Sequence, residues 1–274
     1  MRAYSSYKDI VKLLNKASSI GLVPTMGSLH EGHLSLVKKA LDENDYVIVS
    51  IYVNPKQFDN KNDLINYPRN LEKDLKKLET FNNILAYTPS DKEIYNKGEI
   101  VKTYDLGRFT EIMEGSSRPG HFNGVATIIE KLFKLFNPNN AYFGEKDFQQ
   151  LLLVKTLVKK LKLDINIIGC KTIREDDGLA MSSRNKLMNL AERKNASRII
   201  KILQKCKEMY PSSSTNKLKQ QVSEEIDLID NITLEYFEIL DISKYSDLVK
   251  SDKEIRAFIA CKVGNIRLID NIDI

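Results

Sequence analysis

Two of the three histidines in the chain, His30 and His33, stand where one regular pattern ends and another begins. An apolar run precedes them and stops at Pro24, whereas apolar residues at helical spacing follow them. This order predicts a strand, a turn and a helix, with both imidazoles on one face at the helix entry. A helix N-terminus carries unpaired N–H groups and a partial positive charge, so imidazoles at this position suit the binding of phosphate groups.

The glycines around the histidines support this interpretation. Gly27 and Gly32 have no side chains, so a phosphate or a flat base is able to approach the backbone closely. A pair of surface or capping histidines is the simpler alternative, and it would be preferred for a single histidine. Two histidines in the order His-x-Gly-His at a strand–turn–helix junction favour a phosphate site, and in particular a nucleotide site.

Strands and helices are predicted to alternate up to about residue 170. The run Tyr46–Val53 is apolar and β-branched without alternation, which indicates a strand covered on both faces, as in a parallel sheet. The pattern predicts an α/β fold with a Rossmann-like, doubly wound parallel sheet. The expected strands are residues 20–25, 46–53, 84–87, 141–143 and 165–168, and the expected helices are 6–17, 33 onwards, 71–78, 125–136 and 147–160.

The pattern changes after the polar segment Glu175–Gly178. Two helices are expected there, followed by strands near residues 234–242, 255–263 and 266–270. Gly264-Asn265 is the predicted hairpin turn between the last two strands. We therefore expect a Rossmann-like domain over residues 1–175 and a smaller α+β domain over residues 176–274.

Polar groups follow two further predicted strands, and ligands of open α/β sheets bind beyond the carboxyl ends of strands. Asn54 and Gln57 offer amide donors and acceptors after the second strand, although Asn-Pro alone is only a turn signal. The segment Gly144–Asp147 follows a later strand and carries Lys146, which could neutralise phosphate charge in a transition state. A surface ion pair is the alternative interpretation of this lysine.

A third polar segment, Met181–Arg184, lies beyond the predicted domain boundary, shortly after Thr172-Ile173-Arg174. Two serine hydroxyls and a guanidinium in a short loop would form a phosphate clasp. Helix capping by Ser182 or Ser183 is the alternative. Capping explains the serines but not the neighbouring arginine, so the clasp is preferred.

Composition limits the class of protein. The 274 residues are 42% hydrophobic and 29% charged, which suits a folded protein with a sizeable core and two domains. The net charge is +5, but lysines and acids alternate along the chain, which argues against a nucleic-acid surface. The three cysteines are far apart and suggest neither disulfides nor a metal site. No apolar leader or membrane-length run is present, so a cytoplasmic protein without membrane partners is expected.

Several strings together resemble one family. His30-Glu31-Gly32-His33 is similar to the His-Ile-Gly-His type signature of the nucleotidylyl-transferase superfamily, and the longer run from Pro24 resembles the pantoate–β-alanine ligase (pantothenate synthetase) family more narrowly. The resemblance spans nearly all of residues 20–190 and is weaker beyond them. The other matching strings are Asn54-Pro55-Lys56-Gln57-Phe58, Arg118-Pro119-Gly120-His121-Phe122, Gly144-Glu145-Lys146-Asp147 and Met181-Ser182-Ser183-Arg184.

The resemblance implies an ATP-dependent ligation in two steps. Pantoate would attack the α-phosphate of ATP to give a pantoyl adenylate, and the amine of β-alanine would then displace AMP. Such chemistry depends on positioning and charge neutralisation, which the residues above could supply. A lid-like closure of the second domain over the adenylate is expected, because water would hydrolyse it.

The resemblance also implies roles for individual residues. His33 would be the catalytic acid, with His30 and Lys146 assisting at the phosphates. Gln57 and Gln150 would bind pantoate, with Gln57 also facing β-alanine, and Asn54 and Arg118 are weaker candidates for the substrate side. ATP would contact Met26, Gly27, Ser28, Leu29, His30, Glu31, Gly32, His33, Gly144, Glu145, Lys146, Asp147, Ile173, Met181, Ser182, Ser183 and Arg184.

The metal and the assembly are expected from the resemblance alone. Mg²⁺ would be carried on the ATP phosphates. In the family, acidic groups on the helix after Tyr67-Pro68-Arg69 lie near the metal, and Asp74 matches one of them. Its neighbours Lys73 and Lys77 are basic, so no protein ligand to the metal is assigned. A homodimer is expected.

Two other functions fit part of the sequence. A nucleotidylyl-transferase acting on another small metabolite would explain the histidines but not the Asn54–Phe58 string. A non-catalytic RNA-binding relative of the tRNA synthetases would require a clustered basic face. The dispersed lysines speak against the second alternative.

Overall fold

The computed structural model describes residues 2–15, 17–245 and 254–274. Its contacts divide the chain into two compact units: unit 1 contains residues 1–145 and 149–171, and unit 2 contains residues 146–148 and 172–274. This division differs from the predicted boundary after residue 175. Unit 2 begins earlier because Arg174 forms an antiparallel bridge with Ala180. It also includes residues 146–148, because the ring of Phe148 packs against a residue of the C-terminal sheet, Phe258.

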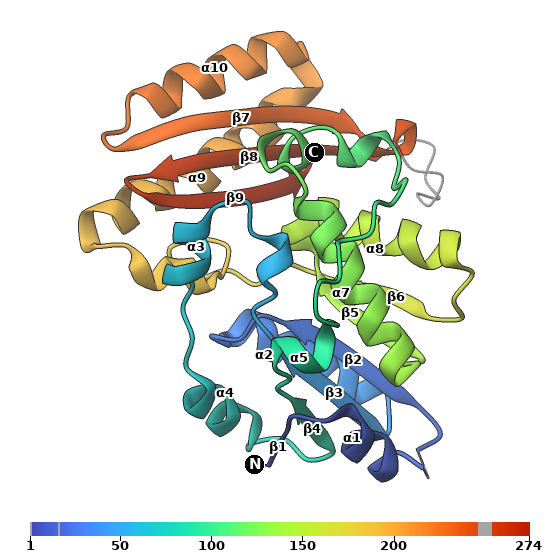
Figure 1. Ribbon diagram of the computed structural model, residues 1–274. Helices are drawn as coiled ribbons and strands as arrows, with labels where there is room; N and C mark the ends of the chain where they lie inside the picture. The colour runs from blue at the N-terminus through green and yellow to red at the C-terminus, as the bar shows by residue number, and fades with distance from the viewer. Residues whose placement is uncertain (1, 16, 246–253) are drawn as a thin grey trace. The chain divides into compact units, whose positions relative to one another are not determined.

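Unit 1 is built on six parallel strands in the order β1-β4-β3-β2-β5-β6 (Figure 1). This order confirms the predicted Rossmann-like, doubly wound sheet. The chain runs outward from β2 in one direction through β3 and β4, and in the other through β5 and β6. The strands are β1 (Ala3–Tyr4), β2 (Ile20–Thr25), β3 (Tyr46–Ile51), β4 (Ile84–Tyr87), β5 (Asn140–Gly144) and β6 (Asn166–Cys170).

The change of direction between β2 and β5 creates the topological switch point of the sheet. The carboxyl ends of these neighbouring strands lead into the histidine turn and into Gly144. Ligands of doubly wound sheets bind at such a point, because the connections leave it in opposite directions and expose the strand ends. The fold therefore puts the predicted phosphate site where a ligand is expected.

Helices cover the sheet of unit 1, and their apolar residues pack against it. On α2, Leu36, Val37 and Ala40 are buried against strand residues that include Val47 and Val49. The helices are α1 (Tyr7–Leu13), α2 (Glu31–Glu43), α3 (Lys61–Asn66), α4 (Leu71–Leu78), α5 (Asp91–Ile94), α6 (Glu114–Ser117), α7 (His121–Phe136) and α8 (Phe148–Leu161), with the 3₁₀ turns η1 (Pro55–Gln57), η2 (Arg108–Thr110) and η3 (Glu145–Asp147).

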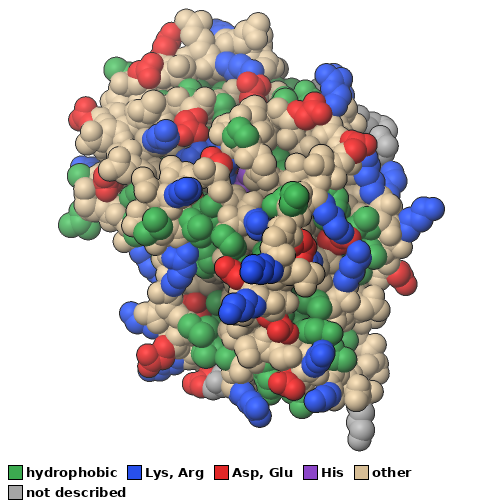
Figure 2. Space-filling model, in the orientation of Figure 1, with side chains coloured by type: hydrophobic (Ala, Val, Ile, Leu, Met, Phe, Trp, Pro, Cys, Tyr) green, Lys and Arg blue, Asp and Glu red, His purple; other side chains and the backbone are tan. Residues whose placement is uncertain are grey.

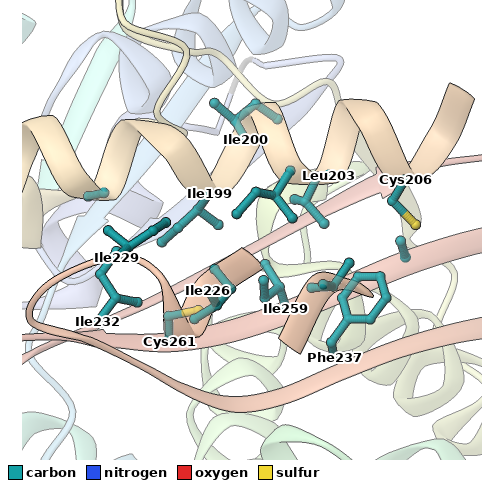
Figure 3. Packing of buried hydrophobic residues seen from close by; sticks show 14 of the residues in the cluster. Ile199, Ile200, Leu203, Cys206, Ile226, Ile229, Ile232, Phe237, Ile259 and Cys261 are labelled. Carbon is teal, nitrogen blue, oxygen red and sulfur yellow. The ribbon is translucent and has the colours of Figure 1, made fainter. Parts of the chain in front are cut away.

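Unit 2 has an antiparallel sheet in the order β7-β8-β9, in which β7 is Ile232–Asp241, β8 is Ile255–Val263 and β9 is Ile266–Asp273. The predicted hairpin at Gly264-Asn265 is confirmed, with Gly264 at a φ of 56°. Apolar side chains of the helices and the sheet fill one core, in which Leu203 and Ile226 are fully buried (Figure 3). The helices are α9 (Leu190–Met209) and α10 (Thr215–Asp227), with the 3₁₀ turns η4 (Ser183–Leu187), η5 (Tyr210–Ser212) and η6 (Ile242–Lys244).

Most differences from the prediction concern the ends of elements and short elements. The helix after the histidine turn begins at Glu31 rather than near residue 33, because His30 is its N-cap. Strand β1 and helix α3 were not predicted, since two and six residues are too short to establish a period. Within the described part of the chain, no helix has the length and apolar character needed to cross a bilayer.

Candidate active site

The histidine turn, residues 26–33, connects the carboxyl end of β2 to the first turn of α2. Gly27 and Ser28 have φ angles of 80° and 50°, in the left-handed region. A Cβ atom on Gly27 would lie 3.0 Å from the Ile51 side chain and 3.1 Å from an Asp74 oxygen. Glycine therefore fits this position both for its backbone angle and for lack of space. The turn delivers His30 and the first backbone N–H groups of α2 to the switch point.

The two imidazoles lie against each other, and their geometry determines a proton position. Their ring centroids are 3.9 Å apart, with planes inclined at 31°. The backbone N–H of His30 donates to Nδ1 of His33 at 3.4 Å. A neutral imidazole that accepts through Nδ1 carries its proton on Nε2. His33 is therefore prepared to donate a proton or a hydrogen bond through Nε2.

Asp74, on α4, holds the backbone of the histidine turn. Its carboxylate is only 2% exposed, and its two oxygens accept the N–H groups of Ser28 at 2.8 Å and Leu29 at 2.7 Å. Lys77, one turn further along α4, donates to the carbonyl of Leu29 at 2.7 Å. Hydrogen bonds of this kind are charge-assisted and stronger than neutral ones. Helix α4 therefore fixes the turn that carries both histidines.

This role of Asp74 was missed in the sequence, where the residue was only matched to acidic groups near a metal. The available signal was its position four residues before Leu78, on the buried side of an otherwise charged helix. Both oxygens of Asp74 bind backbone N–H groups. The described residues contain no cluster of three or more His, Cys, Asp or Glu side chains suited to a metal ion.

Asn54 and Gln57 are buried, with 1% and 8% exposure, rather than displayed on a loop. Asn54 Oδ1 accepts the N–H of Lys56 at 3.3 Å, and its Nδ2 donates to the carbonyl of Gly124 at 3.1 Å. One partner only donates and the other only accepts, so the orientation of the Asn54 amide is fixed. The hydroxyl of Tyr95 also donates to Asn54 Oδ1, at 2.8 Å.

The orientation of Asn54 determines that of Gln57. Asn54 Nδ2 donates to Gln57 Oε1 at 3.1 Å, so the other side of the Gln57 amide, Nε2, faces Met26 Sδ at 3.3 Å. Met26 is the first residue of the histidine turn. Gln57, predicted to bind pantoate, therefore contacts Met26, predicted to bind ATP. The N–H donor of the Gln57 amide lies on the side that faces Met26.

His121 and Arg118 hold the backbone of Gln57. Arg118 Nη1 lies 3.2 Å from His121 Nε2 and can only donate, so Nε2 accepts and Nδ1 donates to the carbonyl of Gln57 at 2.8 Å. Burial, and secondly the charge of Arg118, lower the pKa of His121 to about 4. Arg118 also pairs with Asp59 and Glu114, at 3.3 and 3.4 Å. Arg118, a weaker candidate for the substrate side, thus pairs with two acidic side chains and contacts His121, which holds Gln57.

Gln150, the second residue predicted for pantoate, is partly exposed on α8 in unit 1. Its neighbour Gln149 is buried and has a structural role. Gln149 Nε2 donates to the carbonyls of Phe109 and Ile112, and its Oε1 accepts the N–H of Glu114. The amide of Gln149 is therefore fully hydrogen-bonded to the segment around α6, whereas Gln150 is partly exposed.

The other predicted ATP residues divide between the units. Gly144 ends β5 and Glu145 begins η3, both in unit 1, whereas Lys146 and Asp147 belong to unit 2. Lys146 Nζ lies 3.5 Å from Asp147 Oδ1. Unit 2 also contains Ile173 and Met181–Arg184, and the N–H of Met181 donates to the carbonyl of Ile173 at 3.0 Å. The predicted set is therefore two groups, one in each unit.

Two groups in the predicted phosphate clasp have other partners. Ser182 is the N-cap of η4, and its Oγ accepts the N–H of Arg184 at 3.3 Å. This is the capping role that the sequence offered as the alternative to the clasp. Arg174 forms a two-pronged ion pair with Asp270, at 2.7 and 3.0 Å, and donates to the carbonyl of Gly178.

Surface charge is mixed on the face drawn in Figure 2, where lysines and arginines alternate with acidic side chains. Ion pairs between partly exposed side chains of the chain include Lys160 with Asp105 and Lys205 with Glu225. A continuous basic face of the kind that binds nucleic acid is not seen in this view.

Comparisons with known proteins agree on one family. A family model described as pantoate-β-alanine ligase matches residues 1–273. Pantothenate synthetase of Flavobacterium psychrophilum is 46% identical over 264 residues, which cover 95% of this chain and 94% of that protein. The crystal structure of pantothenate synthetase from Thermus thermophilus matches with a TM-score of 0.92 and 36% identity, over 100% of this chain and 99% of that one. Pantoate-β-alanine ligase from Francisella tularensis, complexed with "Beta-gamma ATP and Beta-alanine", matches with a TM-score of 0.83 and 37% identity, over 100% and 97% of the two chains.

Proposed function

Since the chain belongs to the pantoate–β-alanine ligase family and joins pantoate to β-alanine with ATP, we propose that it does so through a pantoyl adenylate formed beside the histidine turn. A pantoate carboxylate oxygen attacks the α-phosphorus, and the bond to the bridging oxygen breaks to release pyrophosphate. The amine of β-alanine then attacks the acyl carbon, and the products are pantothenate, AMP and a proton. Adenylation turns a poor acylating agent into one with a good leaving group.

One observation carries this proposal: the amide N–H of Gln57 is directed at Met26, at the start of the histidine turn. An N–H donor at this place suits a hydroxyl or carboxylate oxygen of pantoate, next to the phosphates bound by the turn. We assign the same residue to the carboxylate of β-alanine in the second step. Gln150 is the second pantoate residue of the proposal.

The histidine turn would stabilise the charge that moves onto the phosphates during adenylation. Backbone N–H groups at the start of α2 and the Nε2 proton of His33 are donors at a position where negative charge accumulates. His33 is the proposed acid, and His30 lies against it. The Asp74 clamp fixes these donors before the substrate arrives, so that little reorganisation is required in the transition state.

Unit 2 would supply the cationic groups. We assign to Lys146 the neutralisation of phosphate charge in the adenylation transition state, and to the loop Met181–Arg184 the binding of ATP phosphates. In this proposal unit 2 acts as a lid that excludes water from the adenylate. Small-angle scattering with and without ATP and pantoate tests the lid, because unchanged scattering curves would contradict closure.

Three further parts of the proposal concern conditions and assembly. Mg²⁺ would arrive on the ATP phosphates. A reducing compartment such as the cytoplasm suits three cysteines that are all free and buried. The enzyme would be a homodimer, which light scattering after size-exclusion chromatography tests directly.

Pyrophosphate release is the decisive assay. With ATP and pantoate alone we expect a burst of pyrophosphate of about one equivalent of enzyme, and with β-alanine added we expect continuous release together with free AMP. Release that needs β-alanine from the start would contradict adenylation as the first step. With β-alanine present, a final product that still retains AMP would instead identify a nucleotidylyl-transferase.

A further inference from the structure

The lysine segment, residues 146–148, is attached to the last strand of the chain. Asn271, on β9, is 4% exposed, and its Nδ2 donates to the backbone carbonyl of Lys146 at 2.8 Å. The two residues are 125 positions apart in the sequence. A backbone carbonyl at this position needs a partner because it lies in a partly buried contact. Asn271 provides it, although it belongs to neither of the segments predicted to bind ATP.

The Asn271 amide is itself held in one orientation. Arg256 Nη1, which can only donate, lies 2.7 Å from Asn271 Oδ1, and the carbonyl of Lys146 can only accept from Nδ2. Reversal of the amide would break both hydrogen bonds. The N–H of Asn271 also donates to Oδ1 of Asp270 at 2.8 Å. The contact to Lys146 is therefore directional and rigid.

A second contact fixes the other end of the lysine segment. The Arg256 guanidinium lies over the ring of Phe148, 4.0 Å from its centroid, and the ring of Phe258 lies 6.1 Å away on the same strand, β8. A guanidinium at this distance is attracted to the ring face. Arg256 thus contacts both Asn271 and Phe148, and the segment is held at its first and last residues.

Strand β9 also contacts the region of the loop Met181–Arg184. Asp270 pairs with Arg174, which donates to the carbonyl of Gly178, and η4 packs against β9. Two adjacent residues of β9 therefore contact two segments that lie far apart in the sequence. Asp270 contacts Arg174, before the loop Met181–Arg184, and Asn271 contacts the lysine segment.

We propose that Asn271 is a positioning residue for Lys146: by holding the Lys146 carbonyl, it fixes the peptide plane from which the lysine side chain extends. This inference rests on the proposed role of Lys146 in adenylation. Loss of the contact allows the plane to rotate, so the ammonium group spends less time where the phosphate charge develops. The acyl-transfer step, in which Lys146 has no assigned role, is unaffected.

The test compares the two half-reactions in single and double variants. Asn271→Asp keeps the acceptor for Arg256 but replaces the donor to Lys146 with a carboxylate oxygen, which cannot donate to that carbonyl, and Asn271→Ala removes both contacts. Adenylation is measured as pyrophosphate release from ATP and pantoate, and acyl transfer as pantothenate formed from synthetic pantoyl adenylate and β-alanine. We expect Asn271→Asp to slow adenylation about tenfold, corresponding to one lost hydrogen bond, and to leave acyl transfer within about twofold.

The double variant with Lys146→Ala separates positioning from general damage. If Asn271 acts through Lys146, Asn271→Asp adds nothing to the loss caused by Lys146→Ala. Equal losses in both half-reactions, or an additive loss in the double variant, would overturn the inference. A matched control is Asn195→Ala, since Asn195 also donates to a backbone carbonyl of unit 2, that of Asp230, without contacting the lysine segment.

Failure of this inference is distinguishable from failure of the proposed function. Slow adenylation in Lys146→Ala together with normal rates in both Asn271 variants would overturn only the role of Asn271. Normal adenylation in Lys146→Ala would overturn both the role of Lys146 and that of Asn271. Thermal unfolding of each variant checks that the rates come from folded protein.

Discussion

The histidine turn of unit 1 and the lysine segment of unit 2 are held in place in different ways. The turn is fixed by a buried carboxylate, Asp74, that lies 45 residues after Leu29 and within the same α/β unit. The lysine segment is fixed by a neutral amide, Asn271, 125 residues away on the last strand. The first support is made within 45 residues of sequence, whereas the second requires a strand, β9, that lies 125 residues from the segment it holds.

This difference predicts how damage spreads from each support. The Asp74 clamp binds two N–H groups with one buried charge, so its loss should reduce both the stability of unit 1 and the preorganisation of the turn. The Asn271 contact satisfies a single carbonyl, and its loss should change rate more than stability. Variants in each region therefore test whether the two supports differ in this way.

The largest effect is expected from His33→Asn. Asparagine keeps an acceptor close to the position of Nδ1 and so preserves the hydrogen bond from His30, but it lacks the donor at Nε2. Adenylation should fall about 100-fold or more, with an unchanged unfolding temperature. His33→Gln, which carries an amide N–H nearer the position of Nε2, is the matched variant and should lose less. Near-normal adenylation in His33→Asn would remove this residue from the mechanism.

Lys146→Ala should also slow adenylation about 100-fold, because a cation is removed from the developing phosphate charge. Lys146→Arg keeps the charge and is expected to retain part of the activity. Rapid-quench measurement of pyrophosphate release gives both rates. A loss in acyl transfer that equals the loss in adenylation would show that the lysine acts elsewhere in the reaction.

Asp74→Asn should have an intermediate effect. The new amide can accept only one of the two N–H groups and places its own NH₂ opposite the other, which costs about 1–3 kcal/mol. We expect adenylation to slow about tenfold, mainly through a higher KM for ATP, because the turn is less ordered before binding. Glu72→Gln on the same helix is the control, since Glu72 is exposed. A fall in stability with unchanged kinetics would reduce Asp74 to a purely structural role.

Tyr95→Phe should give a smaller effect, confined to the substrate side. It removes one of the donors that orient Asn54 and, through it, Gln57. We expect the KM for pantoate to rise about threefold and the KM for ATP to stay constant. Tyr52→Phe is the matched control, because Tyr52 donates to Asp91 in the same unit without contacting Asn54. Equal changes in both KM values would contradict the orienting role.

The smallest effect on turnover is expected at His121, which supports Gln57, and the measurable effect there is on stability. The pKa of His121 is about 4 when folded, below its unfolded value of about 6.5, so the unfolded chain binds more protons between these values. Stability should therefore be complete above about pH 6.5 and fall by about 2 kcal/mol at pH 5. Urea unfolding at several pH values measures this slope. His121→Gln should flatten it, and an identical slope in the variant would assign the loss to other groups.

Much of unit 1 could be predicted from the sequence because its signals are local. The apolar run before Pro24, the glycines and the helical spacing after His33 all lie within one strand–turn–helix stretch, and the switch point follows from the rules of parallel sheets. The helix that ends at Asn137-Pro138 was predicted from the same kind of signal, and Asn137 has a left-handed φ of 41°.

The supports of the site could not be predicted because they depend on contacts between distant segments. Asp74 was matched only to acidic groups near a metal, and nothing near Lys146 in the sequence indicates that it belongs to unit 2. Asn54 and Gln57 were predicted only as amide donors and acceptors in a loop after a strand, and nothing in the local sequence indicates that they are buried. Their burial follows from the close approach of α7, where a Cβ atom on Gly124 would lie 2.3 Å from the carbonyl oxygen of Lys56.

The path of the chain between the units limits how this protein can be divided. The backbone enters unit 2 at residue 146, returns to unit 1 at 149 and enters unit 2 again at 172. A fragment beginning at residue 172 would leave Arg256 without the aromatic ring of Phe148 and Asn271 without its carbonyl. Neither unit can therefore be exchanged with that of a relative by a single crossover. A working chimera would have to transfer residues 146–148 together with the C-terminal strands.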